Sequence, residues 1–431
     1  MAHTHTYPNY LSASGWNALL PPAPAKPSLV GDLACKVAII GAGFTGIAAA
    51  KRWAEKAPAD SIVLLDSSVI GEGNPGRNSG FLLEVSLAED ANALQVDRMA
   101  NSNRLLSETM EHIVDEVRKT GDSIDLQRRG TYRAAASAVG MKALNNYRDF
   151  LQASNLSFED LNCKQLKQRI GSEFYQAGLY SPHCYLAQPA QLIRTLAKSL
   201  PASVSLFENT PALSLVRADN RWTITSPQGR VIADTVILAN NGFAKNLGFG
   251  RSRLVAMYTY AALTPVLSDD VLAELGSDTN WGILPTHRLG STLRRTQDGR
   301  LLIRSQHGYE KETPPLEVKQ ALQQRLAERY PGLPITEFEH VWGGAVGFTY
   351  NGGVFWGEKQ PGLFVSAGCN GGGTVKGSLL GRLLVDQAFG EAILDVDLLF
   401  GQASWMPPEP LRLAGFLASS LVEKITGKGE L

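Results

Sequence analysis

The residues best suited to chemistry lie in a glycine-rich turn near the start of the chain. A run of apolar residues, 37–40, enters this turn, and an alanine-rich helical pattern leaves it. Strand, tight glycine turn and helix, in that order, are what a dinucleotide pyrophosphate site requires. The glycines allow a sharp turn, a close backbone approach to phosphate and close packing of helix on strand, while the helix N-terminus offers free N–H groups. The predicted pyrophosphate residues are Gly41, Gly43, Phe44, Thr45 and Gly46.

A carboxylate follows at a suitable distance. Residues 61–65 form a second apolar run that ends at Asp66, with Ser67 directly after it. At the end of a buried strand, Asp66 is placed to accept a hydrogen bond from a ribose 2′-hydroxyl. The alternative is an ordinary cap at the end of a strand.

The next stretch, 67–81, is rich in glycine and in small hydroxyl and amide side chains, which indicates a loop. Its many donors could wrap a phosphate or a polar cofactor chain, and a flexible surface loop is the alternative. The candidate residues in it are Arg77, Asn78, Ser79 and Gly80.

Two later strands end at small polar or glycine residues. Residues 235–239 form a buried strand that stops at Asn240, so Ala239 and Asn240 are expected at a ligand-facing sheet edge. Residues 363–367 form another strand, which leads through a second glycine turn into a helix reaching Leu384. The candidate residues of this turn are Gly368, Asn370, Gly371, Gly372, Gly373 and Thr374.

The remaining elements must position these two turns. Apolar periodicity predicts helices over 87–120, 142–153, 164–170, 191–200 and 316–330. Short runs at 204–207, 213–216, 222–225 and 231–233 predict a small antiparallel meander, and residues 251–340 predict a second sheet with helices. Residues 410–427 carry a helical apolar stripe, which packs on this chain or a second subunit, or else touches a membrane surface.

Composition excludes several classes of function. The 431 residues carry 41 basic and 41 acidic side chains, so no net field attracts nucleic acid or an anionic membrane. Four scattered cysteines form no metal or disulfide spacing, which fits a reducing cytoplasm. We expect no metal site, no signal peptide and no transmembrane segment.

Taken together, the motifs resemble those of the D-amino acid oxidase superfamily of FAD-dependent oxidoreductases, and within it the glycine/sarcosine oxidase and gamma-glutamylputrescine oxidase branch. The likeness spans residues 36–385. It is carried by GAGFTG at 41–46, VLLD at 63–66, GRNSG at 76–80, VILANNG at 236–242, LRRTQDGRLLIR at 293–304, WGG at 342–344 and GCNGGGTVKGSLLGRLL at 368–384.

The resemblance implies an α/β (α+β) fold with a Rossmann-like FAD-binding domain and a second domain with a mixed or antiparallel sheet. The FAD domain would be discontinuous, from 35–90, 186–250 and 341–390, and the substrate domain would comprise 91–185 and 251–340. An N-terminal extension, 1–34, and a C-terminal helical segment, 391–431, flank them. FAD would be held without a covalent bond, its pyrophosphate at the first glycine turn and its flavin at the second.

The implied reaction is oxidation of the carbon–nitrogen bond of an amine or amino acid, with O2 or another acceptor taking the electrons. Two rivals are a flavin-binding redox or partner subunit and a flavin-dependent hydroxylase. Oligomeric state stays open.

Substrate recognition should come from the second sheet. Arg304 suits a substrate carboxylate, because the planar fork of an arginine binds both oxygens. The alternative is that Arg304 is a solvated strand residue. Alternation along a strand puts Tyr258 and Tyr260 on one side, facing substrate or packing within the sheet. The substrate-face candidates are Tyr258, Tyr260, Arg304, His307 and Trp342.

Overall fold

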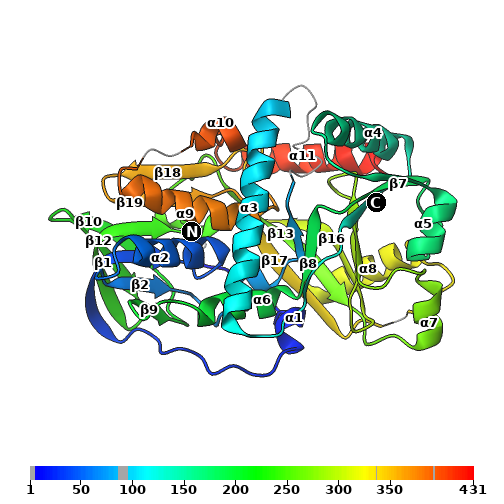
Figure 1. The fold of residues 1–431 in the computed structure, drawn as a ribbon. Helices are drawn as coiled ribbons and strands as arrows, with labels where there is room; N and C mark the ends of the chain where they lie inside the picture. The colour runs from blue at the N-terminus through cyan, green and yellow to red at the C-terminus, as the bar shows by residue number, and fades with distance from the viewer. Residues whose placement is uncertain (1–4, 86–95, 336, 392–393) are drawn as a thin grey trace.

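The computed structural model describes residues 5–85, 96–335, 337–391 and 394–431. Two eight-stranded sheets stand side by side, and a third, smaller sheet has three strands (Figure 1). The first sheet carries both glycine turns, and the second provides the opposite wall of the site.

The first sheet has a parallel centre in which β1 (Gly31–Ile40) lies between β2 and β12. The N-terminal half of β12 pairs antiparallel with β11, and its C-terminal half pairs parallel with β19. The apolar runs predicted as strands are buried on both faces, as a covered parallel sheet requires. Its other strands are β2 (Ile62–Leu65), β9 (Val204–Phe207), β10 (Ser214–Ala218), β11 (Arg221–Ser226), β12 (Gly229–Leu238), β18 (Phe355–Gln360) and β19 (Leu363–Ala367).

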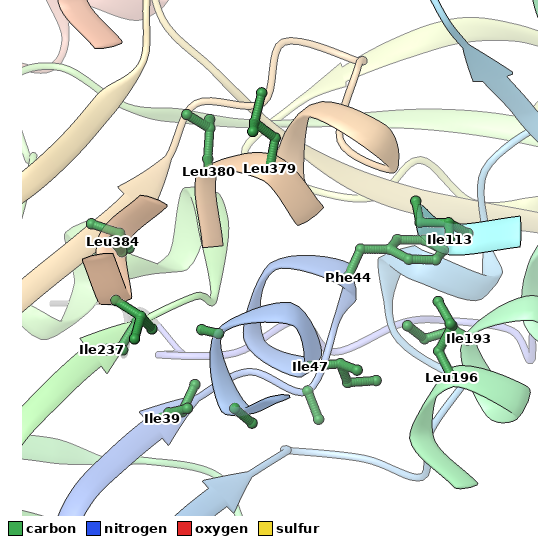
Figure 2. Packing of buried hydrophobic residues seen from close by; sticks show 14 of the residues in the cluster. Ile39, Phe44, Ile47, Ile113, Ile193, Leu196, Ile237, Leu379, Leu380 and Leu384 are labelled. Carbon is green, nitrogen blue, oxygen red and sulfur yellow. The ribbon is translucent and has the colours of Figure 1, made fainter. Parts of the chain in front are cut away.

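Four helices build up one side of this sheet: α2 (Phe44–Lys56) and α9 (Val375–Ala388) lie on its strands, while α3 (Val96–Thr120) and α6 (Pro189–Lys198) pack against α9 and α2. Their apolar sides meet the strands in one continuous cluster. Figure 2 shows its centre, to which β1, β12 and all four helices contribute: Ile39, Phe44, Ile47, Ile113, Ile193, Leu196, Ile237, Leu379, Leu380 and Leu384.

The second sheet is antiparallel except where β14 pairs parallel with β5. Its order is β17-β13-β16-β15-β14-β5-β7-β6. Helix α8 (Pro315–Arg329) packs on one face through Val318, Leu322 and Leu326. The strands are β5 (Thr131–Ala135), β6 (Glu159–Asn162), β7 (Ala177–Ser181), β13 (Val255–Leu263), β14 (Trp281–Pro285), β15 (Thr292–Arg295), β16 (Leu301–Tyr309) and β17 (His340–Phe348).

Shorter elements connect these layers. The small sheet comprises β3 (Phe81–Leu83), β4 (Leu126–Arg128) and β8 (Cys184–Ala187), in the order β3-β8-β4. The helices α4 (Ala138–Ala153), α5 (Cys163–Ile170) and α7 (Asp269–Glu274) belong to the half of the molecule built on the second sheet (Figure 1). The remaining turns are α1 (Gly15–Ala18), η1 (Asn74–Gly76), η3 (Asn241–Leu247) and α10 (Val396–Phe400).

Most predicted elements are confirmed, with two differences in the first sheet. The α/β class is confirmed, and Pro189 begins α6 as a proline in the first turn should. The meander prediction is wrong for residues 204–207, because β9 pairs parallel with β2 at the far edge of the sheet. The runs at 231–233 and 235–239 belong to one long strand, β12, that ends at Leu238. The predicted helix over 87–120 begins at Val96, and its first part lies outside the described residues.

The C-terminal helix α11 (Leu411–Thr426) lies on the second-sheet side, where Phe416 packs at 5.0 Å from the ring of Tyr309. Its apolar stripe, Leu413, Leu417, Leu421 and Ile425, is exposed. None of the helices in the described ranges is long and apolar enough to cross a membrane.

Candidate active site

The first glycine turn lies at the carboxyl end of β1 with the geometry that its sequence predicts. Gly41 has a φ of +102°, and a β-carbon there would lie 2.9 Å from the carbonyl oxygen of Ala239. A β-carbon on Gly46 would lie 1.9 Å from the carbonyl oxygen of Gly41, so only glycine lets α2 start this close to the strand. Gly41, Gly43, Phe44 and Thr45 line a large cavity, whereas Gly46 packs behind the turn.

Asp66 stands beside this turn at the end of β2 and also lines the cavity, together with Ser67. Its Oδ2 accepts from the N–H of Ala42 at 2.9 Å, and its Oδ1 accepts from the N–H of Ser68 at 3.0 Å. Burial raises the pKa of Asp66. Ser68 Oγ also donates to Oδ1, at 3.3 Å, so Oδ2 keeps a lone pair for a ligand hydroxyl.

The second glycine turn meets the first through a direct contact of helices. Thr45, in the first turn of α2, packs against Gly377 and Gly381 of α9: a β-carbon on Gly381 would lie 2.3 Å from its carbonyl oxygen. Neither helix start has a side-chain cap. The unpaired N–H groups of two adjacent helix N-termini thus lie along one cavity, which favours negative charge.

One part of the late turn, residues 368–374, lines the cavity, and the other part packs behind it. Gly371, Gly372, Gly373 and Thr374 line the cavity. Gly368 and Asn370 do not line it, and their contact with a cofactor stays a prediction. The Asn370 amide is committed to the neighbouring loop, since its Oδ1 accepts from the N–H of Thr349 at 2.9 Å and its Nδ2 donates to the carbonyl of Gly352 at 2.7 Å.

The loop after Asp66 lines the cavity through Arg77, Asn78 and Ser79, but the guanidinium of Arg77 is held by protein acceptors. It donates to the carbonyls of Glu72, Gly343 and Ser12 at 2.6, 2.8 and 2.8 Å. Burial lowers the pKa of Arg77. We infer that Arg77 fixes the path of the loop.

Gly80 lies behind this loop and not on the cavity wall, so its contact with a cofactor stays a prediction. A β-carbon at Gly80 would lie 2.1 Å from Nη1 of the buried Arg294, and its φ is +79°. Its N–H donates to Oδ1 of Asn78 at 2.8 Å. A glycine is therefore required here by the packing of the loop.

At the end of β12, Ala239 and Asn240 line the cavity. Both Oδ1 and Nδ2 of Asn240 are buried and have no hydrogen-bond partner among the described residues. A buried amide without partners costs about 1–3 kcal/mol, so a ligand is expected to use it.

The second sheet contributes Arg304, Thr259, Thr292 and Leu284 to the opposite wall. The guanidinium of Arg304 donates to Oγ1 of Thr259 through Nε at 3.0 Å and Nη2 at 2.7 Å. Thr292 is the cross-strand neighbour of Arg304 on β15. An oriented cation thus faces the cavity beside two hydroxyl groups.

The four other substrate-face candidates do not line the cavity. Tyr258 and Tyr260 do share a face of β13, but that face packs toward α8 in the second core cluster, and Tyr260 Oη accepts from the N–H of Thr313 at 2.6 Å. Thr259, between them, points to the cavity instead. Neither tyrosine lines the cavity, and their contact with substrate stays a prediction.

His307 and Trp342 also do not line the cavity. His307 pairs with Thr259 across the strands, and burial lowers its pKa to about 4. Trp342 is buried, and its Nε1 donates to the carbonyl of Arg77 at 3.1 Å. Trp342 therefore supports the loop from behind.

Several lining residues escaped the sequence analysis. The N-terminal extension supplies Thr6, Tyr7, Pro8 and Tyr10. The aromatic residues of this extension were the sequence feature that could have indicated its contact with the site. Lys376 lines the late turn, within the motif that carried the family resemblance. An apolar part of the wall comes from Phe81, Leu83, Val85, Leu106 and Phe400.

Comparison with known families decides what this cavity holds. The family described as FAD dependent oxidoreductase matches residues 36–387 of this sequence. The chain belongs to this family. The match begins just before the first glycine turn and ends in α9, after the second.

Curated relatives agree with this assignment. The probable oxidoreductase OrdL of Rhizobium meliloti (strain 1021) is 27% identical over 408 residues, which cover 90% of each chain. The gamma-glutamylputrescine oxidoreductase of Escherichia coli (strain K12) is 22% identical and covers 84% of this chain and 85% of its own. Glycine oxidase from Geobacillus kaustophilus has the same fold, with a TM-score of 0.72, 18% identity, and coverage of 86% of this chain and 99% of that one.

The residues of this FAD-dependent oxidoreductase fit its cofactor. The cavity is continuous from Asp66, past both helix N-termini, to Arg304 on the second sheet, as a long dinucleotide requires. The buried amide of Asn240, which has no partner among the described residues, offers a donor and an acceptor on this wall, and the glycines that line the first turn leave its backbone open to a phosphate chain. In the described ranges, no group of three or more His, Cys, Asp or Glu side chains is arranged to hold a metal ion.

Proposed function

We propose that this protein oxidises the carbon–nitrogen bond of an amine or amino acid that carries a carboxylate. The observation that supports it is the Arg304–Thr259 pair, held on the wall that faces both glycine turns. A planar guanidinium oriented by two hydrogen bonds to one hydroxyl suits a carboxylate, because its fork matches the two carboxylate oxygens. The names of two relatives, a glycine oxidase and a gamma-glutamylputrescine oxidoreductase, are consistent with such substrates.

Bound FAD supplies the redox chemistry, by accepting a hydride from the carbon next to a neutral amine nitrogen. The protein then has to orient that carbon and exclude water. Phe81, Leu83 and Leu106 give the cavity an apolar surface, on which the neutral form of an amine is favoured over its ammonium form. The resulting imine hydrolyses after release from this surface.

The cavity offers little acid–base chemistry, in agreement with this proposal. Among its described lining residues, Asp66 is the single carboxylate and no histidine is present. Asp66 lies beside the first glycine turn, on the opposite side of the site from Arg304. Direct hydride transfer from a neutral amine needs no base beside the reacting carbon, so this lining suits it.

We expect FAD to be held without a covalent bond. Cys369 is the one cysteine among the described lining residues, and its Sγ accepts from Nδ2 of Asn241 at 3.1 Å. The four cysteines are all free thiols, which supports action in the cytoplasm. Either O2 or another acceptor completes the cycle.

Anaerobic mixing of the FAD-loaded protein with candidate substrates tests this function. The panel comprises glycine, sarcosine, D- and L-amino acids, gamma-glutamylated amines, and matched amines without a carboxylate. We expect a carboxylate-bearing amine to bleach the visible flavin absorbance, and peroxide after admission of air would identify O2 as the acceptor. Inertness toward every amine would contradict the proposal and favour a redox or partner subunit.

A further inference from the structure

The N-terminal segment, which precedes the family match, forms part of the cofactor cavity. Thr6, Tyr7, Pro8 and Tyr10 all line it. Thr6 Oγ1 donates to the carbonyl of Ala212 at 2.6 Å, next to the part of the wall that holds Asp66.

Tyr10 is the residue of this segment with the most defined position. Its ring lies 3.7 Å from the guanidinium of Arg77, and its Oη accepts from the N–H of Ala345 at 3.3 Å. Burial raises the pKa of Tyr10 to about 12, so the phenol keeps its proton at neutral pH. That proton has no acceptor among the described residues, although a Tyr hydroxyl in such a place normally finds one.

The segment is anchored to the same loop that lines the cavity. Leu11 N–H donates to Glu312 at 2.8 Å, and Ser12 accepts from Arg77. Ser14 Oγ donates to the carbonyl of Gly76 at 2.5 Å, and Trp16 Nε1 donates to the carbonyl of Asn78 at 2.8 Å. These bonds make the segment and the 72–78 loop one structural unit.

We propose that residues 5–17, the N-terminal strap, close the FAD site, and that Tyr10 donates a hydrogen bond to an oxygen of bound FAD. The proposal rests on the FAD dependence of the family and not on the amine substrate. Because the strap crosses the cavity wall, FAD leaves only after the strap detaches. The strap therefore slows FAD dissociation.

Three full-length variants test the strap by FAD binding alone. Tyr10→Phe keeps the ring on Arg77 and removes only the hydroxyl, so the Kd for FAD should rise about fivefold. Tyr10→Ala removes the ring as well and should raise the Kd by about 10–100-fold, mainly because FAD dissociates faster. The rise of flavin fluorescence after dilution measures that dissociation rate. Asn9→Ala, at an exposed neighbour that does not line the cavity, should leave the Kd unchanged. Equal Kd values in all three variants would overturn the proposal.

Proteolysis provides a second measurement on the unmodified protein. Chymotrypsin has sites after Tyr10 and Trp16, and saturating FAD should slow cleavage there at least tenfold if the strap closes on the cofactor. Equal cleavage with and without FAD would refute the strap. A protein that binds FAD but oxidises no amine would contradict the proposed function and leave the strap intact.

Discussion

Thr45 and Gly381 are in backbone contact, although 336 positions separate them in the printed sequence. A β-carbon on Gly381 would lie 2.3 Å from the carbonyl oxygen of Thr45, so the start of α2 and the side of α9 can approach this closely only at a glycine. The contact brings together the two helices that follow the two glycine turns. It explains how segments at opposite ends of the chain line one cavity.

Gly381→Ala should therefore damage both stability and cofactor binding. The added methyl group meets backbone and not a movable side chain, so we expect a loss of about 1–3 kcal/mol in the free energy of unfolding. FAD affinity should fall as well, because α2 shifts. Gly415→Ala on α11 is the control: its β-carbon meets nothing within 4 Å, and alanine favours a helix by about 1 kcal/mol. Equal changes in Tm for the two variants would contradict the contact.

Replacing Asn240 should weaken FAD binding without destabilising the apoprotein. Asn240→Leu removes a buried amide that has no partner in the described structure, so the Tm of the apoprotein should not fall. The Kd for FAD should rise about tenfold, since a ligand loses one hydrogen-bonding side chain. Flavin fluorescence titration and thermal unfolding measure the two effects separately.

For the neighbouring residue, Asn241, we expect the opposite effect on apoprotein stability. Its Oδ1 accepts from the N–H of Gly368 at 3.0 Å, and its Nδ2 donates to Cys369. Asn241→Leu should thus lower the apoprotein Tm, because these groups lose their partner and because Asn241 has a φ of +49°. If Asn240→Leu destabilised the apoprotein as much, its amide would have a structural role.

The glycine turn was predictable from sequence because its constraints are local. The glycines at 41, 43 and 46 follow from one strand, one turn and one helix, and Asp66 follows from the next strand. By contrast, the alternation of Tyr258 and Tyr260 showed only that they share a face. Which face meets the cavity depends on where α8 packs, and that contact lies more than 50 residues away.

The late turn shows a second limit of local reasoning. Asn370 has the residue type and position of a cofactor donor, yet its amide is satisfied by the loop around Gly352. Only the tertiary path of that loop decides this. The same holds for Tyr10, whose partner Arg77 is distant in sequence and whose role is visible only once the extension is folded back on the site.

Arg304→Met should raise the KM for a carboxylate-bearing amine about 10–100-fold and change kcat less, because the substrate loses a charge-assisted hydrogen bond. Thr259→Val should act in the same direction more weakly, since it removes the hydroxyl that orients the guanidinium. Thr259→Ser keeps that hydroxyl and is the control. An equal rise in KM for amines without a carboxylate would show that Arg304 shapes the cavity and does not bind the carboxylate.

His307 should make the protein less stable in mild acid. Burial, with the nearby charges of Arg304 and Lys424, lowers its pKa from 6.5 to about 4 in the folded protein. Between these values the unfolded chain binds a proton that the folded protein does not, so the free energy of unfolding falls as pH falls from 6.5 toward 4. Because the side chain is partly exposed, we expect about 1–2 kcal/mol from this residue.

Urea unfolding of the protein and of His307→Asn at pH 7 and pH 4.5 measures this contribution. His183 and His340 also have lowered pKa values, but both remain in the variant, so the difference between the two proteins isolates His307. The variant should gain stability relative to the parent at pH 4.5, whereas His5→Asn, at the exposed N-terminal end, should not. Parallel pH profiles for parent and His307→Asn would mean that the imidazole is protonated in the folded protein at pH 4.5, and that its place between Thr259 and Lys424 tolerates a charge.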